Sequence, residues 1–148
     1  MGEHRVHLDW RGDGRPFTYE SYSRNHTLTF KDGVALTVSA APAWRGDGAH
    51  ADPEDLLVAA LSSCHMLSFL ALCAKARLVV EDYRDDAVGF LENAGGKWWM
   101  TRVILRPRVR FAAAPGADIL ARLHHQAHDA CFIANSVKTD VRVELDQA

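Results

Sequence analysis

The sequence predicts an α+β fold in which mostly antiparallel strands surround a long central helix, within a single domain over residues 1–148. Two observations lead to this prediction. The first and last thirds contain short stretches of alternating apolar and polar residues bounded by turn residues, which is the pattern of strands. Between them lies a long apolar stretch that opens with helix start signals. The order of strands, long helix, strands, helix and strand is typical of the α+β class.

Composition limits the classes of partner. The 148 residues are 48% hydrophobic and 24% charged, which is enough for one domain with its own core. The net charge of −2, with both signs interspersed, gives no electrostatic footprint for nucleic acid or an anionic membrane. No apolar run reaches the roughly 18 residues of a membrane helix, and MGEHRVHLDW lacks the apolar stretch of a secretory signal. We therefore expect a cytoplasmic protein without a membrane or nucleic-acid partner.

The first third predicts strands. Val6, Leu8 and Trp10 alternate with polar residues, and the alternation resumes from Phe17 to Ser21. Two further strands, SRNHTLTF and VALTVSA, are separated by Lys31-Asp32-Gly33. An Asp-Gly pair between two alternating stretches is a strong signal for a hairpin turn.

The central helix is predicted from about Pro53 to Ala76. Asp52 fits the N-cap, Pro53 the first helical position, and the acidic residues after it complement the helix dipole. Apolar residues then cover nearly every face, as in a helix that is buried on all sides. One chain of this size can hardly enclose such a helix, so we expect a second helix or a second subunit to pack against it.

After the helix, two strands flank Asn93-Ala94-Gly95-Gly96 as a long hairpin. Its second arm carries a stripe of arginines, which we expect to pair with acidic residues across the sheet: Arg102, Arg106, Arg108 and Arg110 with Glu81, Asp82, Asp85 and Asp86. A second helix follows Pro115-Gly116 and ends near Cys131, and VKTDVRVEL is a closing strand.

Three cysteines in a reducing compartment are inert, metal-bound or redox-active. A reactive cysteine must form a thiolate, whereas Cys64 lies in the middle of an apolar helix, where burial would raise its pKa. The helix N-terminus is about three turns away, so a reactive Cys64 would need a cation from elsewhere in the fold. The residues alone therefore favour a packing role for Cys64. Cys73 points to roughly the opposite helix face and is also read as packing.

Cys131 differs because it lies where a helix ends and the chain can move. Two thiols that are distant in sequence, one buried in a helix and one at a helix end, could form a peroxidatic and resolving pair.

Two segments carry a resemblance to a known family. They are DPEDLLVAALSSCHMLSFLALCAKA, residues 52–76, and CFIANSVKTDV, residues 131–141, with a weaker match over residues 22–42. Together with the element order, the chain resembles the OsmC/Ohr family over nearly its whole length. This resemblance implies an α+β fold, an intertwined homodimer, and reduction of organic hydroperoxides by a cysteine pair without a cofactor.

The resemblance also implies roles for individual residues. Cys64 would be the peroxidatic thiol and Cys131 the resolving thiol. Glu54 matches the family glutamate, and Arg24 is the candidate for the family arginine. Arg24 would supply the cation that Cys64 needs, and Glu54 would hold the guanidinium by a bidentate pair. In place of the proline that many members have after the second cysteine, this chain has Phe132.

Helix geometry constrains these roles. Glu54 and Cys64 lie about 15 Å apart along a straight helix, too far for one guanidinium to bridge. We therefore expect a site assembled across a dimer interface. The thiolate would attack the peroxide, a Cys64–Cys131 disulfide would follow, and a dithiol reductant such as lipoyl groups, thioredoxin or small thiols would restore it. An apolar site would favour alkyl or lipid hydroperoxides.

Two alternatives stay open. His124, His128 and Cys131 are spaced to share one helix face, and with His65 they could form a His/Cys metal site. A polar surface role for the histidines of the second helix is the simpler interpretation, and a packing or hydrogen-bonding role is expected for His65. In the second alternative, the same fold is a non-catalytic, ligand-binding dimer in which Cys64 belongs to the core.

Overall fold

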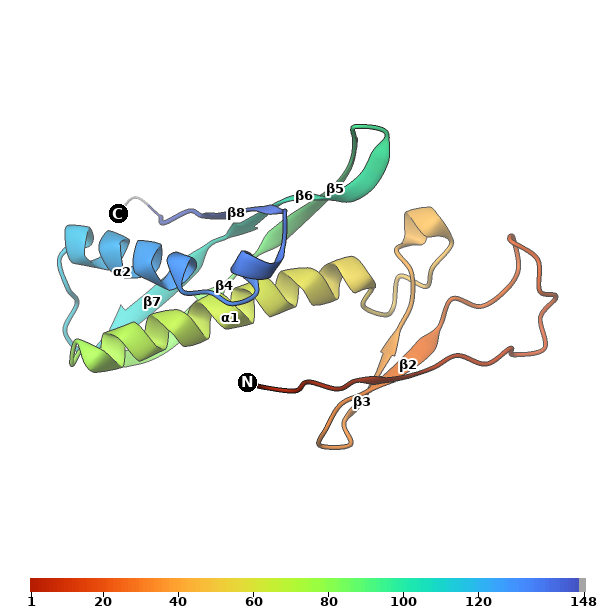
Figure 1. The fold of residues 1–148 in the computed structure, drawn as a ribbon, viewed down its shortest axis with the longest axis horizontal. Coiled ribbons are helices and arrows are strands. Elements are labelled where there is room, and N and C mark those ends of the chain that lie inside the picture. Colours follow the sequence, from red (N-terminus) through yellow and green to blue (C-terminus); the bar gives the residue numbers. More distant parts are fainter. Residues whose placement is uncertain (147–148) are drawn as a thin grey trace. The chain divides into compact units, whose positions relative to one another are not determined.

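A computed structural model describes residues 1–146 of the chain. It divides into two compact units, the first from Met1 to Leu56 and the second from Leu57 onward (Figure 1). The chain therefore consists of two units within the span that the sequence analysis treats as one domain.

The first unit is built on an antiparallel sheet of three strands in the order β1-β2-β3. Its elements are β1 (His7–Asp9), β2 (His26–Thr29), β3 (Ala35–Val38) and the short 3-10 helix η1 (Pro42–Trp44). The predicted hairpin is confirmed, because Leu28 faces Leu36 and Gly33 adopts a φ of 80° in the turn. The left-handed φ is the reason that glycine suits this position.

The strand expected from Phe17 to Ser21 is wrong. These residues form a turn in which the Ser21 hydroxyl donates to the carbonyl of Pro16 at 2.6 Å and bonds the Thr18 hydroxyl at 2.6 Å. Ser and Thr side chains compete with strand hydrogen bonds in this way. The aromatic side chains alternate in sequence, but Phe17 packs against Trp10 and Tyr22 instead of lying on a sheet.

Helix α1 (Pro53–Lys75) begins where the sequence predicts. Asp52 accepts a hydrogen bond from the amide of Asp55 at 2.9 Å, and Asp55 accepts one from the amide of Asp52 at 3.2 Å. This reciprocal pair satisfies backbone donors that a helix start leaves without partners. The N-cap assignment of Asp52 is therefore confirmed.

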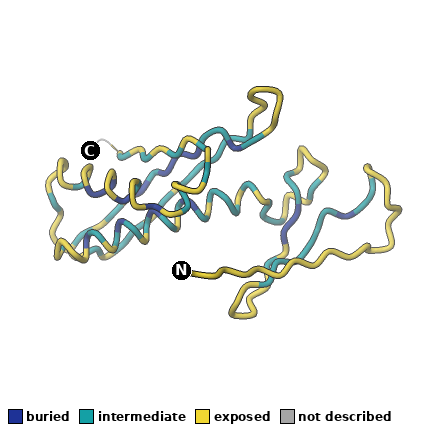
Figure 2. The backbone as a smooth tube through the Cα atoms, viewed as in Figure 1, coloured by how far each residue is buried: buried dark blue, intermediate teal, exposed yellow. Residues whose placement is uncertain are grey.

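Helix α1 buries one stripe of its surface. The buried side chains recur every fourth residue and are Leu61, His65, Phe69 and Cys73 (Figure 2). The other faces are apolar but only partly covered, and Leu67 is 60% exposed. The expectation that no apolar segment is long enough for a membrane helix is wrong, because Pro53–Lys75 reaches a mean hydropathy of 2.0. Short polar side chains interrupt the apolar run without lowering its mean hydropathy much.

The second unit contains the predicted long hairpin, split into two sheets (Figure 1). One sheet pairs β4 (Val80–Asp85) with β7 (Pro107–Phe111); the other joins β5 (Val88–Ala94), β6 (Lys97–Leu105) and β8 (Asp140–Val143). Strand β8 runs parallel to β6, and the other pairs of named strands in both units are antiparallel. The hairpin turns at Gly95 and Gly96, with φ of 65° and 77°.

A carboxylate marks the point where the hairpin splits. Asp85 accepts a hydrogen bond from the backbone amide of Arg106 at 2.6 Å and another from the Ser62 hydroxyl at 2.5 Å. Because Pro107 follows and has no amide hydrogen, the ladder is interrupted here. Asp85 thus connects the interrupted hairpin to helix α1.

The predicted pairing of the arginine stripe with acidic residues is confirmed in part. Arg108 pairs with Asp86 and Arg110 with Glu81. Arg106 instead pairs with Glu144 at 3.2 Å, and the guanidinium of Arg102 lies 4.3 Å from the ring centre of Phe90. The stripe is therefore a largely solvated and internally compensated surface.

Helix α2 (Ala117–Asp129) ends slightly before the predicted boundary, and a 3-10 turn η2 (Ala134–Ser136) follows it. Two core clusters lie against α1. One contains Leu61 with Met100, Val103 and Leu105 of β6. The other contains Phe69 and Cys73 with Leu123 and Ala127 of α2. Helix α2 therefore packs against one side of α1, as the apolar composition of α1 predicts.

Candidate active site

Two of the predicted site residues meet in the second unit. Cys64 lies in the middle of α1, and Cys131 lies between α2 and η2. The fold brings these thiols, which are distant in sequence, close enough for Cys64 to raise the pKa of Cys131. Both cysteines are reduced thiols. Cys64, which was expected to be buried, is half-buried, and Cys131 at the helix end is 1% exposed.

Cys131 is held by the turn that follows it. Its sulfur accepts a hydrogen bond from the amide of Ala134 at 3.4 Å. Burial raises the pKa of the Cys131 thiol, the Ala134 amide opposes that shift, and the neighbouring Cys64 raises the pKa further. Cys131 therefore keeps its proton at neutral pH.

The third cysteine is separate from this pair. Cys73 is 1% exposed and belongs to the core cluster of Phe69, Leu123 and Ala127. Burial raises the pKa of the Cys73 thiol. The prediction that Cys73 is a packing residue is confirmed.

A buried histidine pair joins α1 to α2. His65 Nε2 and His124 Nδ1 are 3.0 Å apart, and the two rings are nearly parallel, with their centres 5.3 Å apart. The ring of Phe69 stacks on His124, with centres 4.0 Å apart. The expected hydrogen-bonding role of His65 is confirmed, whereas the surface role is wrong for His124, which is 2% exposed.

Both imidazoles are neutral at physiological pH. Burial lowers the pKa of His65 to about 4, the nearby His128 lowers it too, and Asp85 acts in the opposite direction. Burial and the neighbouring His65 lower the pKa of His124 to about 4. A neutral pair can share one hydrogen bond, in which one ring donates and the other accepts.

The sequence contained a signal for this pair that its analysis missed. His65 shares the four-residue spacing of the buried stripe of α1, and His124 lies among Leu120, Leu123 and Ala127 on α2. A histidine in phase with core residues indicates a buried ring, but only the fold identifies its partner.

The metal alternative finds no support in this geometry. Helix α2 ends at Asp129, so Cys131 is not on the same helix face as His124 and His128. Within residues 1–146, no group of three or more His, Cys, Asp or Glu side chains could hold a metal ion.

Arg24 and Glu54 belong to the first unit. The Arg24 guanidinium donates to the carbonyls of Tyr22 at 2.6 Å and Tyr19 at 2.5 Å, and it lies 3.6 Å from the ring centre of Tyr22. Glu54 is in the first turn of α1, where its charge complements the helix dipole. No ion pair joins Arg24 to Glu54 within the described chain, so their pairing stays a prediction.

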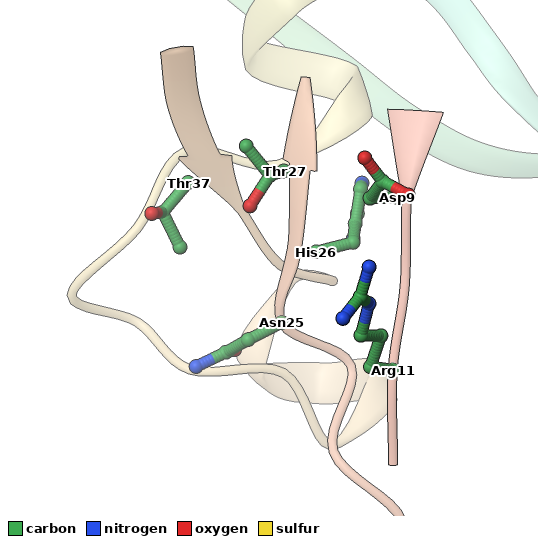
Figure 3. Close-up of a pocket in the computed structure, with 6 residues that line it drawn as sticks. All are labelled: Asp9, Arg11, Asn25, His26, Thr27 and Thr37. Carbon is green, nitrogen blue, oxygen red and sulfur yellow. The ribbon is translucent and has the colours of Figure 1, made fainter. Parts of the chain in front are cut away.

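The first unit also has a polar pocket of about 370 Å³ over its sheet. Figure 3 shows its lining side chains, which are Asp9, Arg11, Asn25, His26, Thr27 and Thr37. Its charges are of both signs and it contains no thiol. This pocket therefore has polar binding groups, whereas the nucleophilic groups lie in the second unit.

Comparisons with known proteins agree on the fold. Residues 46–146 match the family described as OsmC-like protein. The structure of an OsmC-like protein of unknown function from Vibrio cholerae is 46% identical, with a TM-score of 0.92 over 98% of this chain and 99% of that one. The uncharacterized protein YmaD of Bacillus subtilis is 23% identical over 152 residues, covering 99% of this chain and 95% of YmaD.

A further similarity concerns the fold alone. The organic hydroperoxide resistance protein OhrB of Bacillus subtilis is 16% identical, with a TM-score of 0.70 over 98% of each chain. The predicted α+β, OsmC-like fold is thereby confirmed.

Proposed function

This chain belongs to the OsmC-like protein family, and from that premise we propose that it is a thiol-dependent peroxidase that reduces organic hydroperoxides. One observation carries the proposal. Cys64 and Cys131 lie on different elements but close enough for Cys64 to raise the pKa of Cys131, while Cys73 is buried in the core. A pair poised in this way can form and release a disulfide.

The first step takes place at Cys64. Its thiolate attacks the outer oxygen of the hydroperoxide, and the O–O bond breaks. Cys64 becomes a sulfenic acid, and the alkoxide leaves as an alcohol after it takes up a proton. The sulfur is oxidised by two electrons and the peroxide is reduced by two.

The second step uses Cys131. Its sulfur attacks the sulfenic sulfur of Cys64, an S–S bond forms, and the hydroxyl leaves as water with one proton. The raised pKa of Cys131 supports this order, because Cys131 stays a thiol while Cys64 reacts first. A dithiol, such as a lipoyl group, or small thiols then return both cysteines to the reduced state by exchange.

The nucleophile needs a cation, and we assign that role to Arg24, oriented by Glu54. A guanidinium beside a thiolate lowers the thiol pKa and stabilises the charge that leaves with the alkoxide. We place the complete site in a homodimer, in which α1 is covered on its remaining faces. The exposed apolar surface of α1, with Leu67 60% exposed, supports this assembly.

The apolar surroundings support organic peroxides as substrates. Ile133 and Val137, which follow Cys131, pack against the Leu61 cluster. Phe132 is 81% exposed beside Cys131 and offers an apolar contact. The name of OhrB points to the same substrate class. We assign the reaction to the cytoplasm, where reducing thiols are available.

Steady-state turnover tests the proposal. Reduced protein is mixed with an excess of dihydrolipoamide and either cumene hydroperoxide or hydrogen peroxide, and the remaining peroxide is measured. We expect faster consumption of cumene hydroperoxide, loss of consumption in Cys64→Ser, and nearly unchanged consumption in Cys73→Ala. Cys131→Ser should react with one equivalent and accumulate a sulfenic acid that dimedone labels.

The contrary result is equally clear. If folded wild-type protein and Cys64→Ser consume both peroxides at the same rate as buffer, the peroxidase proposal fails. A non-catalytic role on the same fold then replaces it.

A further inference from the structure

The His65–His124 pair is a polar link between the two helices that carry or lead to the thiols. His65 directly follows Cys64 on α1, and His124 is on α2, whose C-terminal end leads to Cys131. The two rings are 1% and 2% exposed and joined by the 3.0 Å hydrogen bond. Phe69 closes the stack on His124.

The described residues around the pair offer the two rings no other hydrogen-bond partner. The other ring nitrogens, His65 Nδ1 and His124 Nε2, are buried and have no partner among the described residues. If α2 slid along α1, both rings would lose their hydrogen bond and stay buried. A buried polar group without a partner is costly, so this pair favours one register of the two helices.

Register matters because a disulfide tolerates little misplacement. Its Cβ atoms must lie roughly 3.5–4.5 Å apart, and the torsion about the S–S bond is restricted. Cys64 is fixed by α1, and Cys131 is placed by the end of α2 and by the Ala134 amide. A shift of α2 would therefore carry the Cys131 sulfur out of reach.

We propose that His65 and His124 are positioning residues that hold the Cys131 thiol at the Cys64 thiol and so favour the disulfide between them. The inference rests on the proposed cysteine pair and specifies how that pair is kept together. It assigns the histidines no contact with the peroxide and no proton transfer.

Equilibration of the full chain with dithiothreitol tests this role without any peroxide. The reduced protein and oxidised dithiothreitol exchange two electrons and two protons, which yields the Cys64–Cys131 disulfide and reduced dithiothreitol. Acid quenching, alkylation and peptide mapping give the equilibrium constant. This constant measures the effective concentration of one thiol at the other, which is the quantity that positioning residues set.

The variants separate the hydrogen bond from the ring. His124→Phe keeps a stacked ring but removes the bond, whereas His124→Asn places an amide atom where Nδ1 was. We expect His124→Phe to lower the equilibrium constant about tenfold, which corresponds to about 1.4 kcal/mol. His124→Asn and the matched control His125→Phe, on the exposed face of the same helix, should stay within about twofold of the wild type.

Far-ultraviolet circular dichroism confirms that each variant is folded. If His124→Phe does not fold, His65→Phe removes the same bond from α1, and His65→Gln supplies its conservative partner. A constant within about twofold of the wild type in the folded Phe variant would overturn the proposal. A fall in the amide variant that equals or exceeds the fall in the Phe variant would also overturn it, because the hydrogen bond that the amide restores would then not be responsible.

The outcomes also distinguish this inference from the peroxidase proposal. If the variants behave as expected but the protein consumes no hydroperoxide, the positioning role stands and the peroxidase function fails. If the protein is a peroxidase and the constants do not change, only the positioning role fails. A wild-type protein that forms no Cys64–Cys131 disulfide at any dithiothreitol ratio would overturn the positioning role together with the disulfide step.

Discussion

Acidification should destabilise the reduced protein through its buried histidine pair. Both pKa values are about 4 in the folded chain, against an ordinary value of 6.5. The unfolded chain therefore binds more protons between these two values, and stability falls as the pH falls. The contribution of the pair is fully present above about pH 6.5 and is lost progressively toward pH 4.

The size of the effect follows from linkage. At pH 5 an unfolded histidine is about 1.5 pH units below its pKa of about 6.5, and each unit is worth about 1.36 kcal/mol. The folded rings stay neutral at that pH. Each histidine therefore costs about 2 kcal/mol on going from pH 8 to pH 5, and the pair about 4 kcal/mol. This is a large share of the 5–15 kcal/mol typical of a folded domain.

Urea unfolding at pH 8 and pH 5, followed by circular dichroism, measures the change. The control is the double variant His65→Gln/His124→Asn, which keeps all other titrating groups. These include the two groups that face the pair, His128 on α2 and Asp85 on β4. We expect the loss of stability at pH 5 to be about 4 kcal/mol smaller in the double variant. Equal losses in the two proteins would refute the reasoning.

Three further predictions concern single side chains, each read from urea unfolding. Asp85→Ala leaves the Ser62 hydroxyl and the Arg106 amide without their acceptor and should lower the free energy of unfolding by about 2 kcal/mol. Ser62→Ala removes only one donor and should lower it by less. Asp52→Ala removes one half of the reciprocal cap and should cost about 1 kcal/mol, against a smaller loss for Asp118→Ala, which removes only an exposed charge from the first turn of α2. Cys73→Ser buries a hydroxyl in an apolar cluster and should lower the free energy of unfolding by about 1–3 kcal/mol. Peroxide consumption should be unchanged, and a loss of consumption would contradict the packing role of Cys73.

The local signals in the sequence were sufficient for most of the fold. Asp52, Gly33 and the Gly95-Gly96 turn each act through their own backbone, so a short sequence window contains the information. The segment from Phe17 to Ser21 was misread because hydroxyl groups in the turn outweigh an apolar alternation. The split of the long hairpin depends on Asp85, whose partners are distant in sequence.

In the candidate site, too, some features could be predicted from the sequence and others depend on residues that are distant in the chain. Cys64 and Cys131 were predicted as a pair, and the fold brings them together. The buried histidine pair was missed, because a polar residue on a helix is ordinarily read as solvent-facing and its partner lies on another helix. The proposed roles of Arg24 and Glu54 depend on how the two units and the proposed subunits assemble, which no local pattern contains.

Peptide mapping after one equivalent of cumene hydroperoxide tests the central claim most directly. Reduced protein is oxidised, the free thiols are alkylated, and the peptides are separated without reduction. The account predicts a Cys64–Cys131 disulfide with Cys73 alkylated, formed faster than with hydrogen peroxide. A folded protein in which Cys64 and Cys131 are both still alkylated after exposure to the hydroperoxide would contradict it.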